Sequence, residues 1–362
     1  MVSTKVVKLS NYKITLRNFV IALDAMGGDL GPHVSLLSAK KILELHPNLS
    51  IIIVGDEQQI QPLVKSLNLS QYSHISFLHA PYSISMEDNP IHVLRQRKNS
   101  SMQMAIDLVA TGKTDACVSA GNTGALMLLA KHSLKMVEGV SRPALVSALP
   151  NGCGGSSYFL DLGANLQCDS DILFDFALMG SVLSQHVEQI KRPRVALLNV
   201  GKENNKGNDE IKHAAMLLKN SEYINYVGFV EANELFLNKA DVIVTDGFSG
   251  NISLKSYEGM GRIFLSELNK AVNSNFYSKL LGKLLSPVLK KQFKHLHPDR
   301  YNGASLIGLR GIVVKSHGSA DEVAFTYAIE QAIKEIQWQI PACISKTLDA
   351  ALSERDSLSH EQ

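Results

Sequence analysis

Short apolar runs alternate along the chain with longer segments in which apolar residues recur at helical spacing. The runs are rich in Val, Ile and Leu and have the length of buried strands, whereas the segments between them are long enough to form helices. This alternation predicts an α/β fold in which helices cover both faces of a mostly parallel sheet. The strands that the pattern predicts are residues 20–23, 51–54, 75–79, 116–119, 195–200, 226–229 and 242–245.

Three stretches depart from this alternation. Residues 144–162 contain two apolar runs around the glycine-rich segment 150–155, which predicts an antiparallel hairpin or arm of a kind suited to a dimer interface. Residues 261–300 lack strand signals and predict an insertion of consecutive amphipathic helices. Beyond the insertion, residues 306–314 predict a further strand and residues 321–339 a closing helix.

These patterns predict one main unit with two flanking segments. We expect an N-terminal extension at residues 1–19, a main α/β/α unit at residues 20–345 that includes the helical insertion, and a polar C-terminal tail at residues 346–362. The tail is expected to be disordered after Ser353. The first residues are polar and basic and contain no apolar stretch of signal-peptide length.

Composition narrows the class of protein. Of the 362 residues, 45% are hydrophobic and 19% charged, and the net charge of +2 does not indicate a nucleic-acid partner. The four cysteines are far apart and form no CxxC pair, which argues against a zinc site or a disulfide framework. No segment has the ~20 apolar residues that a membrane-spanning helix needs. The sequence therefore predicts a cytoplasmic protein that is soluble or peripheral to a membrane.

Four junctions share one arrangement, in which an apolar strand leads into a glycine-rich polar turn and then into a helix. They lie at residues 22–29, 118–125, 198–208 and 245–251. In a parallel sheet such turns emerge at the carboxyl edge, where open α/β folds bind ligands, so we expect the four to enclose one pocket. Glycine lets backbone N–H groups approach a phosphate, and the helix N-terminus favours an anion. None of the turns has the ATP-binding P-loop or the dinucleotide fingerprint.

Individual side chains in these turns have two interpretations. Lys206 is placed to hold a phosphate or a developing oxyanion, although a solvated surface lysine is the alternative. His317 lies in another turn before a helix, where it either belongs to the site or packs locally. His295 and His297 are two residues apart, a spacing that does not suit a metal pair on a helix, and we expect no metal site.

Six ordered motifs between about residues 20 and 340 resemble those of bacterial phosphate acyltransferases, the acyl-ACP:phosphate acyltransferases of phospholipid synthesis (ACP, acyl carrier protein). The motifs are Asp24-Ala25-Met26-Gly27-Gly28-Asp29, Ser119-Ala120-Gly121-Asn122-Thr123-Gly124-Ala125, Asp161-Leu162-Gly163-Ala164-Asn165, Asn199-Val200-Gly201 through Lys206-Gly207-Asn208, Thr245-Asp246-Gly247-Phe248-Ser249-Gly250-Asn251, and Tyr301-Asn302-Gly303-Ala304 through His317-Gly318-Ser319-Ala320.

The resemblance implies a three-layer, Rossmann-like α/β/α fold of the isopropylmalate dehydrogenase type, related to phosphotransacetylase, in a homodimer. It implies that acyl-ACP and inorganic phosphate give acyl phosphate and free ACP, without a metal or nucleotide cofactor. The product would feed a membrane glycerol-3-phosphate acyltransferase, which is a further expected partner. The family's catalytic pair matches Lys206 and Asn251, a cation and an amide donor for the oxyanion of the reaction.

The remaining site residues are predicted from the same turns and from the insertion. Those expected to bind phosphate or substrate are Asp24, Gly27, Gly28, Asp29, Asn122, Thr123, Asn165, Asn199, Gly201, Asp246, Gly247, Ser249, Gly250 and His317. Those expected to contact ACP or the membrane are Leu280, Leu281, Lys283, Leu284, Leu285, Lys290 and Lys291. Ordinary dimer packing is the alternative explanation of the second set.

Two other functions fit parts of the pattern. A dehydrogenase of the same architecture would need a nicotinamide site and clustered aspartates for a divalent metal, and the sequence supplies neither clearly. A membrane-associated scaffold would bind ACP or acyl chains without turnover. Phosphate-dependent release of ACP thiol distinguishes the transferase from both.

Overall fold

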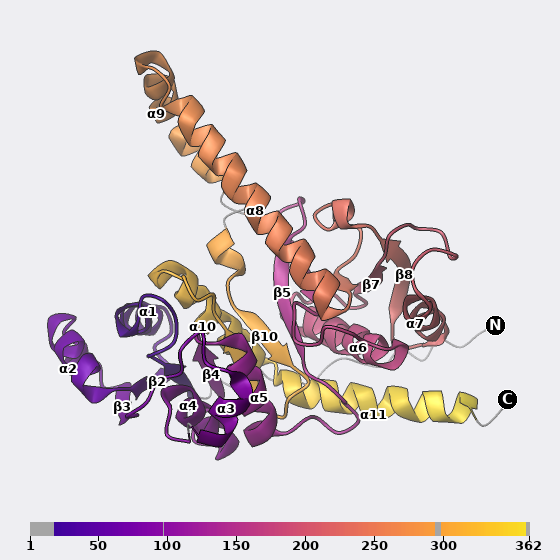
Figure 1. Cartoon of the computed structure of the whole chain (residues 1–362), viewed down its shortest axis with the longest axis horizontal. Coiled ribbons are helices and arrows are strands. Elements are labelled where there is room, and N and C mark those ends of the chain that lie inside the picture. The colour runs from indigo at the N-terminus through magenta and orange to yellow at the C-terminus, as the bar shows by residue number, and fades with distance from the viewer. Residues whose placement is uncertain (1–17, 97, 294–297, 360–362) are drawn as a thin grey trace.

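We describe a computed structural model of the chain over residues 18–96, 98–293 and 298–359. Its strands form a single sheet (Figure 1). They are β1 (Phe19–Asp24), β2 (Leu49–Gly55), β3 (Ile75–His79), β4 (Ala116–Ser119), β5 (Ala144–Pro150), β6 (Ser156–Leu160), β7 (Arg194–Leu198), β8 (Asn225–Val230), β9 (Val242–Val244), β10 (Ala304–Ile307) and β11 (Ile312–Lys315). The order across the sheet is β3-β2-β1-β4-β11-β10-β5-β6-β9-β7-β8. The seven strands predicted between residues 20 and 245 are therefore present.

The helices cover both faces of this sheet, as the sequence predicts. They are α1 (Pro32–Leu45), α2 (Glu57–Ser66), α3 (Pro90–Gln96), α4 (Ser101–Ala110), α5 (Thr123–Leu134), α6 (Ser170–Val187), α7 (Asp209–Asn220), α8 (Gly247–Val272), α9 (Phe276–Phe293), α10 (Glu322–Gln337) and α11 (Ile340–Ser359). One continuous apolar cluster unites α4, α5 and the sheet face that extends to Leu254 of α8. On the other face, α1, α2 and α10 pack over one half, and α6, α7 and α11 over the other. The result is a three-layer α/β/α fold.

The two halves of the sheet run in opposite directions. Strands β3, β2, β1, β4 and β11 are mutually parallel, and β6, β9, β7 and β8 are likewise parallel to one another. Between the two sets, β11 to β10, β10 to β5 and β5 to β6 are three successive antiparallel pairings, so the second set is reversed relative to the first. The carboxyl ends of the two sets consequently lie at opposite edges of the sheet.

The hairpin predicted around residues 150–155 is present as β5 and β6, which also pair with β10 and β9 inside the sheet. The single strand predicted at residues 306–314 is wrong: the chain turns between β10 and β11, and these two strands pair antiparallel. Gly308 lies in this turn with a φ of 91°, a conformation that side chains disfavour. An apolar run can contain a turn when glycine supplies it.

The predicted domain boundaries also shift. The helical insertion does not begin at residue 261, because α8 starts at Gly247, at the glycine-rich turn itself, and passes through that position. Beyond the body of the protein, α8 continues as an outward rod with α9 near its tip (Figure 1). The predicted tail boundary at residue 346 falls inside α11, so Ser353 is helical rather than disordered. Most of the predicted extension, residues 1–17, lies outside the described part of the chain.

The length and hydropathy of a helix decide whether it can cross a membrane. Within residues 18–96, 98–293 and 298–359, no helix combines the length and apolar character needed to cross a bilayer.

Candidate active site

Three turns emerge side by side at one edge of the sheet, because β9 pairs in parallel with both β6 and β7. They follow Leu160, Val244 and Leu198, the last residues of these strands. This first group contains nine of the sixteen residues predicted for catalysis and substrate binding. Its predicted members are Asn165, Asn199, Gly201, Lys206, Asp246, Gly247, Ser249, Gly250 and Asn251.

A buried carboxylate fixes the turn after β6. The side chain of Asp161 accepts hydrogen bonds from the backbone N–H groups of Leu145, Ala164 and Asn165 at 2.9, 3.1 and 2.6 Å. The Asn165 side-chain amide donates to the same carboxylate at 2.9 Å and to the carbonyl oxygen of Pro143 at 2.8 Å. Burial raises the pKa of Asp161, and these hydrogen bonds oppose the shift. The Asn165 amide thus holds the loop, since both donor contacts are made within the protein.

The turn after β9 is the start of α8, and three of its backbone N–H groups already donate within the protein. Asp246 caps the helix by accepting from the N–H of Ser249 at 2.7 Å. The N–H of Gly247 donates to Asn165 O at 2.7 Å, and that of Gly250 to Asp246 O at 2.9 Å. The Gly250 N–H is therefore used within the first turn of α8. Asn251, whose Cβ faces Gly163, is exposed and keeps its side-chain amide at the surface of this turn.

The glycines of this turn serve close packing. A Cβ on Gly247 would lie 2.6 Å from Asn165 O, and one on Gly250 would lie 1.9 Å from Asp161 O. Both distances are far inside normal contact, so the first turn of α8 can rest on the loop after β6 only without side chains. Glycine here places Asn251 next to that loop.

The turn after β7 presents Lys206. The Asn199 side-chain amide donates to Lys206 O at 3.2 Å, and the Lys206 N–H donates to Glu203 O at 3.0 Å. Gly207 has a φ of 86°, and a Cβ there would lie 2.4 Å from Asn199 Oδ1. The buried Asn199 side chain thus stabilises the turn from inside, whereas the Lys206 side chain is exposed.

The neighbouring lysine has a different role. Lys202 Nζ lies 2.6 Å from Glu234 Oε1 in an ion pair, whereas no ion pair among the described residues involves Lys206. Lys206 is therefore the lysine of this turn that is available to an anionic or carbonyl ligand.

The other predicted residues lie at the opposite edge, after β1, β4 and β11. The expectation that all four glycine-rich turns share one carboxyl edge is wrong, because the central antiparallel strands reverse the direction of the second half. This second group comprises Asp24, Gly27, Gly28, Asp29, Asn122, Thr123 and His317.

A buried polar centre organises the second group. Ser119 Oγ donates to Asp24 Oδ2 at 2.6 Å and accepts from the Gly121 N–H at 3.0 Å. Burial raises the pKa of Asp24, and hydrogen bonds from Ser101 and Ser119 oppose that shift. Gly28 adopts a φ of 88°, and a Cβ there would lie 2.9 Å from Gly318 O. The turns after β1 and β11 therefore meet backbone to backbone.

Of the remaining members of this group, Asn122 holds neighbouring segments together and the others lie at the surface. Asn122 Oδ1 caps α5 by accepting from the Ala125 N–H at 3.0 Å, and its amide donates to the carbonyl oxygens of Met86 and Asp88 at 2.9 and 3.1 Å. Thr123, Asp29 and His317 are exposed. Burial lowers the pKa of the His317 imidazole, and the charge of Lys255 lowers it further.

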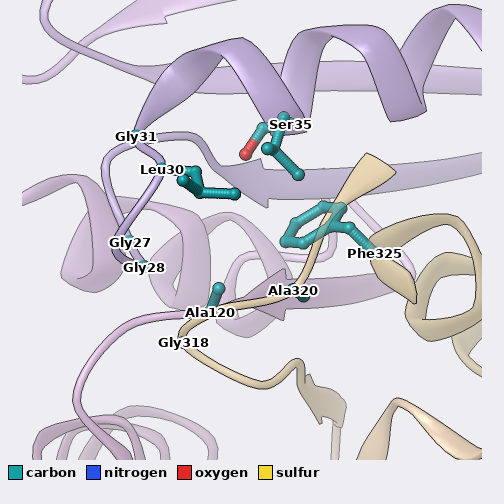
Figure 2. Close-up of a pocket in the computed structure, with 10 residues that line it drawn as sticks. Gly27, Gly28, Leu30, Gly31, Ser35, Ala120, Gly318, Ala320 and Phe325 are labelled. Atoms are coloured by element: carbon teal, nitrogen blue, oxygen red, sulfur yellow. The ribbon is translucent and has the colours of Figure 1, made fainter. Parts of the chain in front are cut away.

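A small pocket lies between the turns after β1 and β11 and the start of α1 (Figure 2). Gly27 and Gly28 form one side, Gly318 and Ala320 another, and the Leu30 and Phe325 side chains reach into it. This lining carries no charged side chain, so the pocket alone does not suit an inorganic anion.

Two lysines near the second group are not among the residues predicted from the sequence. Lys315 ends β11 and is buried, and Lys255 lies on α8 one turn after Asn251. A lysine at the end of an apolar run is a usable signal, because such a charge is costly to bury without a purpose. The position of Lys255 could not be found in this way, since it depends on where α8 crosses the sheet.

The arrangement of His, Cys, Asp and Glu side chains bears on metal binding. Across residues 18–96, 98–293 and 298–359, no group of three or more His, Cys, Asp or Glu residues is arranged to hold a metal ion.

Comparison with known proteins gives a consistent result. The family described as "Fatty acid synthesis protein" matches residues 19–342. A phosphate acyltransferase of Psychromonas ingrahamii is 65% identical over 346 residues, which cover 96% of this chain and 100% of the relative. A phosphate acyltransferase of Shewanella sp. (strain ANA-3) is 50% identical over 337 residues, which cover 93% of this chain and 98% of the relative.

Solved structures share the fold at low sequence identity. The EutD phosphotransacetylase from Staphylococcus aureus superposes with a TM-score of 0.58 at 19% identity, covering 89% of this chain and 94% of its own. A phosphotransacetylase from Streptococcus pyogenes gives a TM-score of 0.56 at 17% identity, covering 87% and 93%. The fold is therefore that of the phosphotransacylases, and the close relatives favour neither the dehydrogenase nor the scaffold. On this sequence and structural evidence, the chain belongs to the phosphate acyltransferase family.

Proposed function

We propose that the protein transfers the acyl group of acyl-ACP to inorganic phosphate, giving acyl phosphate and free ACP. The observation that carries the proposal is the placement of Lys206 and Asn251. They lie on turns that follow the paired strands β7 and β9, and both side chains are exposed. A cation and an amide donor at one sheet edge suit a carbonyl oxygen that becomes an oxyanion.

The chemistry needs positioning more than a strong base. An oxygen of hydrogen phosphate attacks the thioester carbonyl carbon, a C–O bond forms, and the C–S bond breaks as the tetrahedral intermediate collapses. The proton of hydrogen phosphate is transferred to the departing thiolate, so atoms and charge balance. Lys206 and the Asn251 amide stabilise the oxyanion, and correct orientation lowers the barrier by several kcal/mol.

The capping contact of Asp246 defines its part in this scheme. Its carboxylate accepts from the Ser249 N–H at 2.7 Å and closes the first turn of α8. We therefore assign Asp246 to orienting the turn that carries Asn251, rather than to proton exchange.

The assay follows phosphate-dependent release of the ACP thiol, with hydroxylamine trapping of acyl phosphate. We expect Lys206→Ala and Asn251→Ala each to lower kcat by about 100-fold, the size of effect seen when one oxyanion donor is removed. Lys219→Ala, an exposed lysine at the end of α7, is the matched control and should retain activity. Near-normal turnover by Lys206→Ala would show that its electrostatic role is misassigned.

We further propose that the outward helices contact ACP and the membrane surface. Leu280, Leu281, Leu284 and Leu285 have exposed fractions of 51, 58, 68 and 52%. So large an apolar surface on a rod needs a partner, and the exposed Lys283 beside it favours an anionic one. The side chains of Lys290 and Lys291 lie outside the described part of the chain.

The leucines can be tested by replacing all four with serine. We expect the variant to stop co-sedimenting with vesicles of anionic phospholipid and to show a higher KM for acyl-ACP. Co-sedimentation equal to that of the parent would refute the membrane contact. The proposal also includes a homodimer, and sedimentation equilibrium of parent and variant reports whether these leucines are dimer contacts instead.

The product suggests the next partner. An acyl phosphate is a reactive mixed anhydride, so an acyltransferase that consumes it at the membrane is favoured. We propose the membrane glycerol-3-phosphate acyltransferase in that role.

A further inference from the structure

Lys255 of α8 lies near enough to the turn after β11 for its charge to influence His317 of that turn. Asn251 and Lys255 are four residues apart on α8, so they project from the same side of the helix with a rise of about 6 Å between them. Lys255 is exposed, and its Nζ donates to Glu258 Oε2 at 2.8 Å. After burial, the charges of Lys255 and Glu258 are the next largest influences on the pKa of His317, in opposite directions. This face of α8 therefore lies close to His317.

Lys315 lies beneath the same turn. Lys315 is only 8% exposed. Its Nζ donates to the carbonyl oxygen of Ala120 at 3.3 Å and to the carbonyl oxygen of Ser316. An ammonium group has three N–H donors, so these two neutral acceptors leave one donor unused. No carboxylate of the described residues forms an ion pair with Lys315, although Asp24 and Asp29 are near enough to influence it.

Charged groups of both signs surround Lys315. Burial lowers the pKa of Lys315 to about 8, Asp24 and Asp29 oppose the shift, and Lys255 adds to it. Two ammonium groups that repel each other across a turn are stabilised by an anion bound between them. The carboxylate of Asp24 faces inward, because it accepts from Ser119 at 2.6 Å within the protein. Asp29 and Glu258 are the remaining negative groups, and Glu258 is already paired with Lys255.

We propose that Lys255 and Lys315, with His317, bind the inorganic phosphate that attacks the thioester. This inference rests on the proposed function and supplies its missing phosphate site. With the carbonyl oxygen at Asn251, a C=O bond of about 1.2 Å and a near-attack separation of about 3–3.5 Å place the attacking phosphate oxygen within about 5 Å of that oxygen. The rise of about 6 Å from Asn251 to Lys255 is of the same order, so one side of α8 can contact both reactants. The helix thereby joins the oxyanion side of the reaction to the phosphate side.

The decisive variant is Lys255→Met, because Lys255 is exposed and its removal does not disturb the core. We expect the KM for phosphate to rise about ten-fold or more, as loss of one charge-assisted contact predicts, while the KM for acyl-ACP stays within about two-fold. The matched control is Lys270→Met on the same helix, since Lys270 Nζ makes an equivalent i,i+3 ion pair with Glu267 at 2.7 Å. The control should leave the affinity for phosphate unchanged. An unaltered phosphate KM in Lys255→Met overturns the proposal.

Binding measured without turnover separates the two proposals. Isothermal titration calorimetry with inorganic phosphate should show weaker binding by Lys255→Met and by Lys315→Met than by the parent and the Lys270→Met control. Should Lys315→Met fail to fold, the exposed Lys255 decides the question alone. If the parent binds phosphate through Lys255 but releases no thiol from acyl-ACP, the phosphate site stands and the proposed reaction fails. If thiol release is normal and Lys255→Met binds phosphate like the parent, the site is wrong and the reaction stands.

Discussion

The contact between α8 and the loop after β6 makes a sharp prediction for Gly250→Ala. An added Cβ would lie 1.9 Å from Asp161 O, whereas a carbon–oxygen contact needs about 3.3 Å. The start of α8 must therefore move by more than about 1 Å. The loop cannot yield easily, because the Asp161 carboxylate is held by the backbone N–H groups of Leu145, Ala164 and Asn165.

The size of the effect follows from two opposing contributions. Alanine is better than glycine inside a helix by about 1 kcal/mol. Overpacking against a rigid neighbour costs about 3 kcal/mol at the upper end of its usual range, and the neighbour here is backbone. We expect the free energy of unfolding to fall by about 2 kcal/mol, the difference between the two. Asn251 moves with the helix, and a 1 Å misplacement of a catalytic group lowers a rate by about 100-fold.

Urea denaturation and phosphate-dependent thiol release measure both effects. Gly259→Ala is the matched control on the same helix, because an added Cβ there meets no atom within 4 Å. It should raise the free energy of unfolding by up to about 1 kcal/mol and keep full turnover. If Gly250→Ala equals the parent in both assays, the packing argument and the placement of Asn251 by Gly250 are refuted.

Three further substitutions test the scaffold. Asp161→Asn turns one side-chain acceptor into an N–H donor that faces the backbone N–H groups now bonded to Asp161. Urea denaturation should therefore show the free energy of unfolding lowered by about 3 kcal/mol. Asn122→Ala removes the α5 cap and the contacts to residues 85–88, which should cost about 2 kcal/mol and speed amide hydrogen exchange in that loop. Burial raises the pKa of Glu335 from 4.5 to about 7, while hydrogen bonds from Ser305 and Gln331 oppose the shift. The unfolded chain loses the Glu335 proton near pH 4.5, whereas the folded chain keeps it up to about pH 7. The free energy of unfolding therefore falls as the pH rises from about 4.5 to about 7 and levels off above that pH. Glu335→Gln should lack this loss, and its advantage in unfolding free energy should grow by about 3 kcal/mol between about pH 5 and about pH 8; equal pH profiles would contradict the assignment.

The elements of the fold were predictable from the sequence because their signals are local. Val-, Ile- and Leu-rich runs identify the strands. Asp246 before Gly247 and Ser249 is an ordinary N-cap signal, but it does not indicate how far α8 extends. Glycines at residues 247, 250, 259 and 261 hid the continuity of this helix, since glycine is a poor helix former. Its stability in the first turn comes instead from packing on Asp161 and Asn165, which no local pattern reports.

Strand direction was not predictable, and it decided how the site is built. A buried strand has the same apolar pattern whichever way it runs, so the turns after β1 and β9 looked equivalent. The reversal arises from β10, β5 and β6, whose pairing partners are distant in sequence. Six motifs in order identified the family, but their order along the chain contains no information on which sheet edge each turn occupies.

The reversal gives α8 a central place in the proposed site, whose groups lie at both edges of the sheet. One edge of the sheet supplies Asn251 and Lys206, and the other supplies Lys315 and His317. In the described part of the chain, α8 carries a proposed group of each kind, and its backbone fixes the rise from Asn251 to Lys255 at about 6 Å. A shift of α8 therefore moves both groups together and preserves their spacing, while it changes their distances to Lys206 and Lys315. Contacts at the outward end of α8 and at α9 act on the same helix, so we expect a partner that binds there to change these two distances without touching either edge.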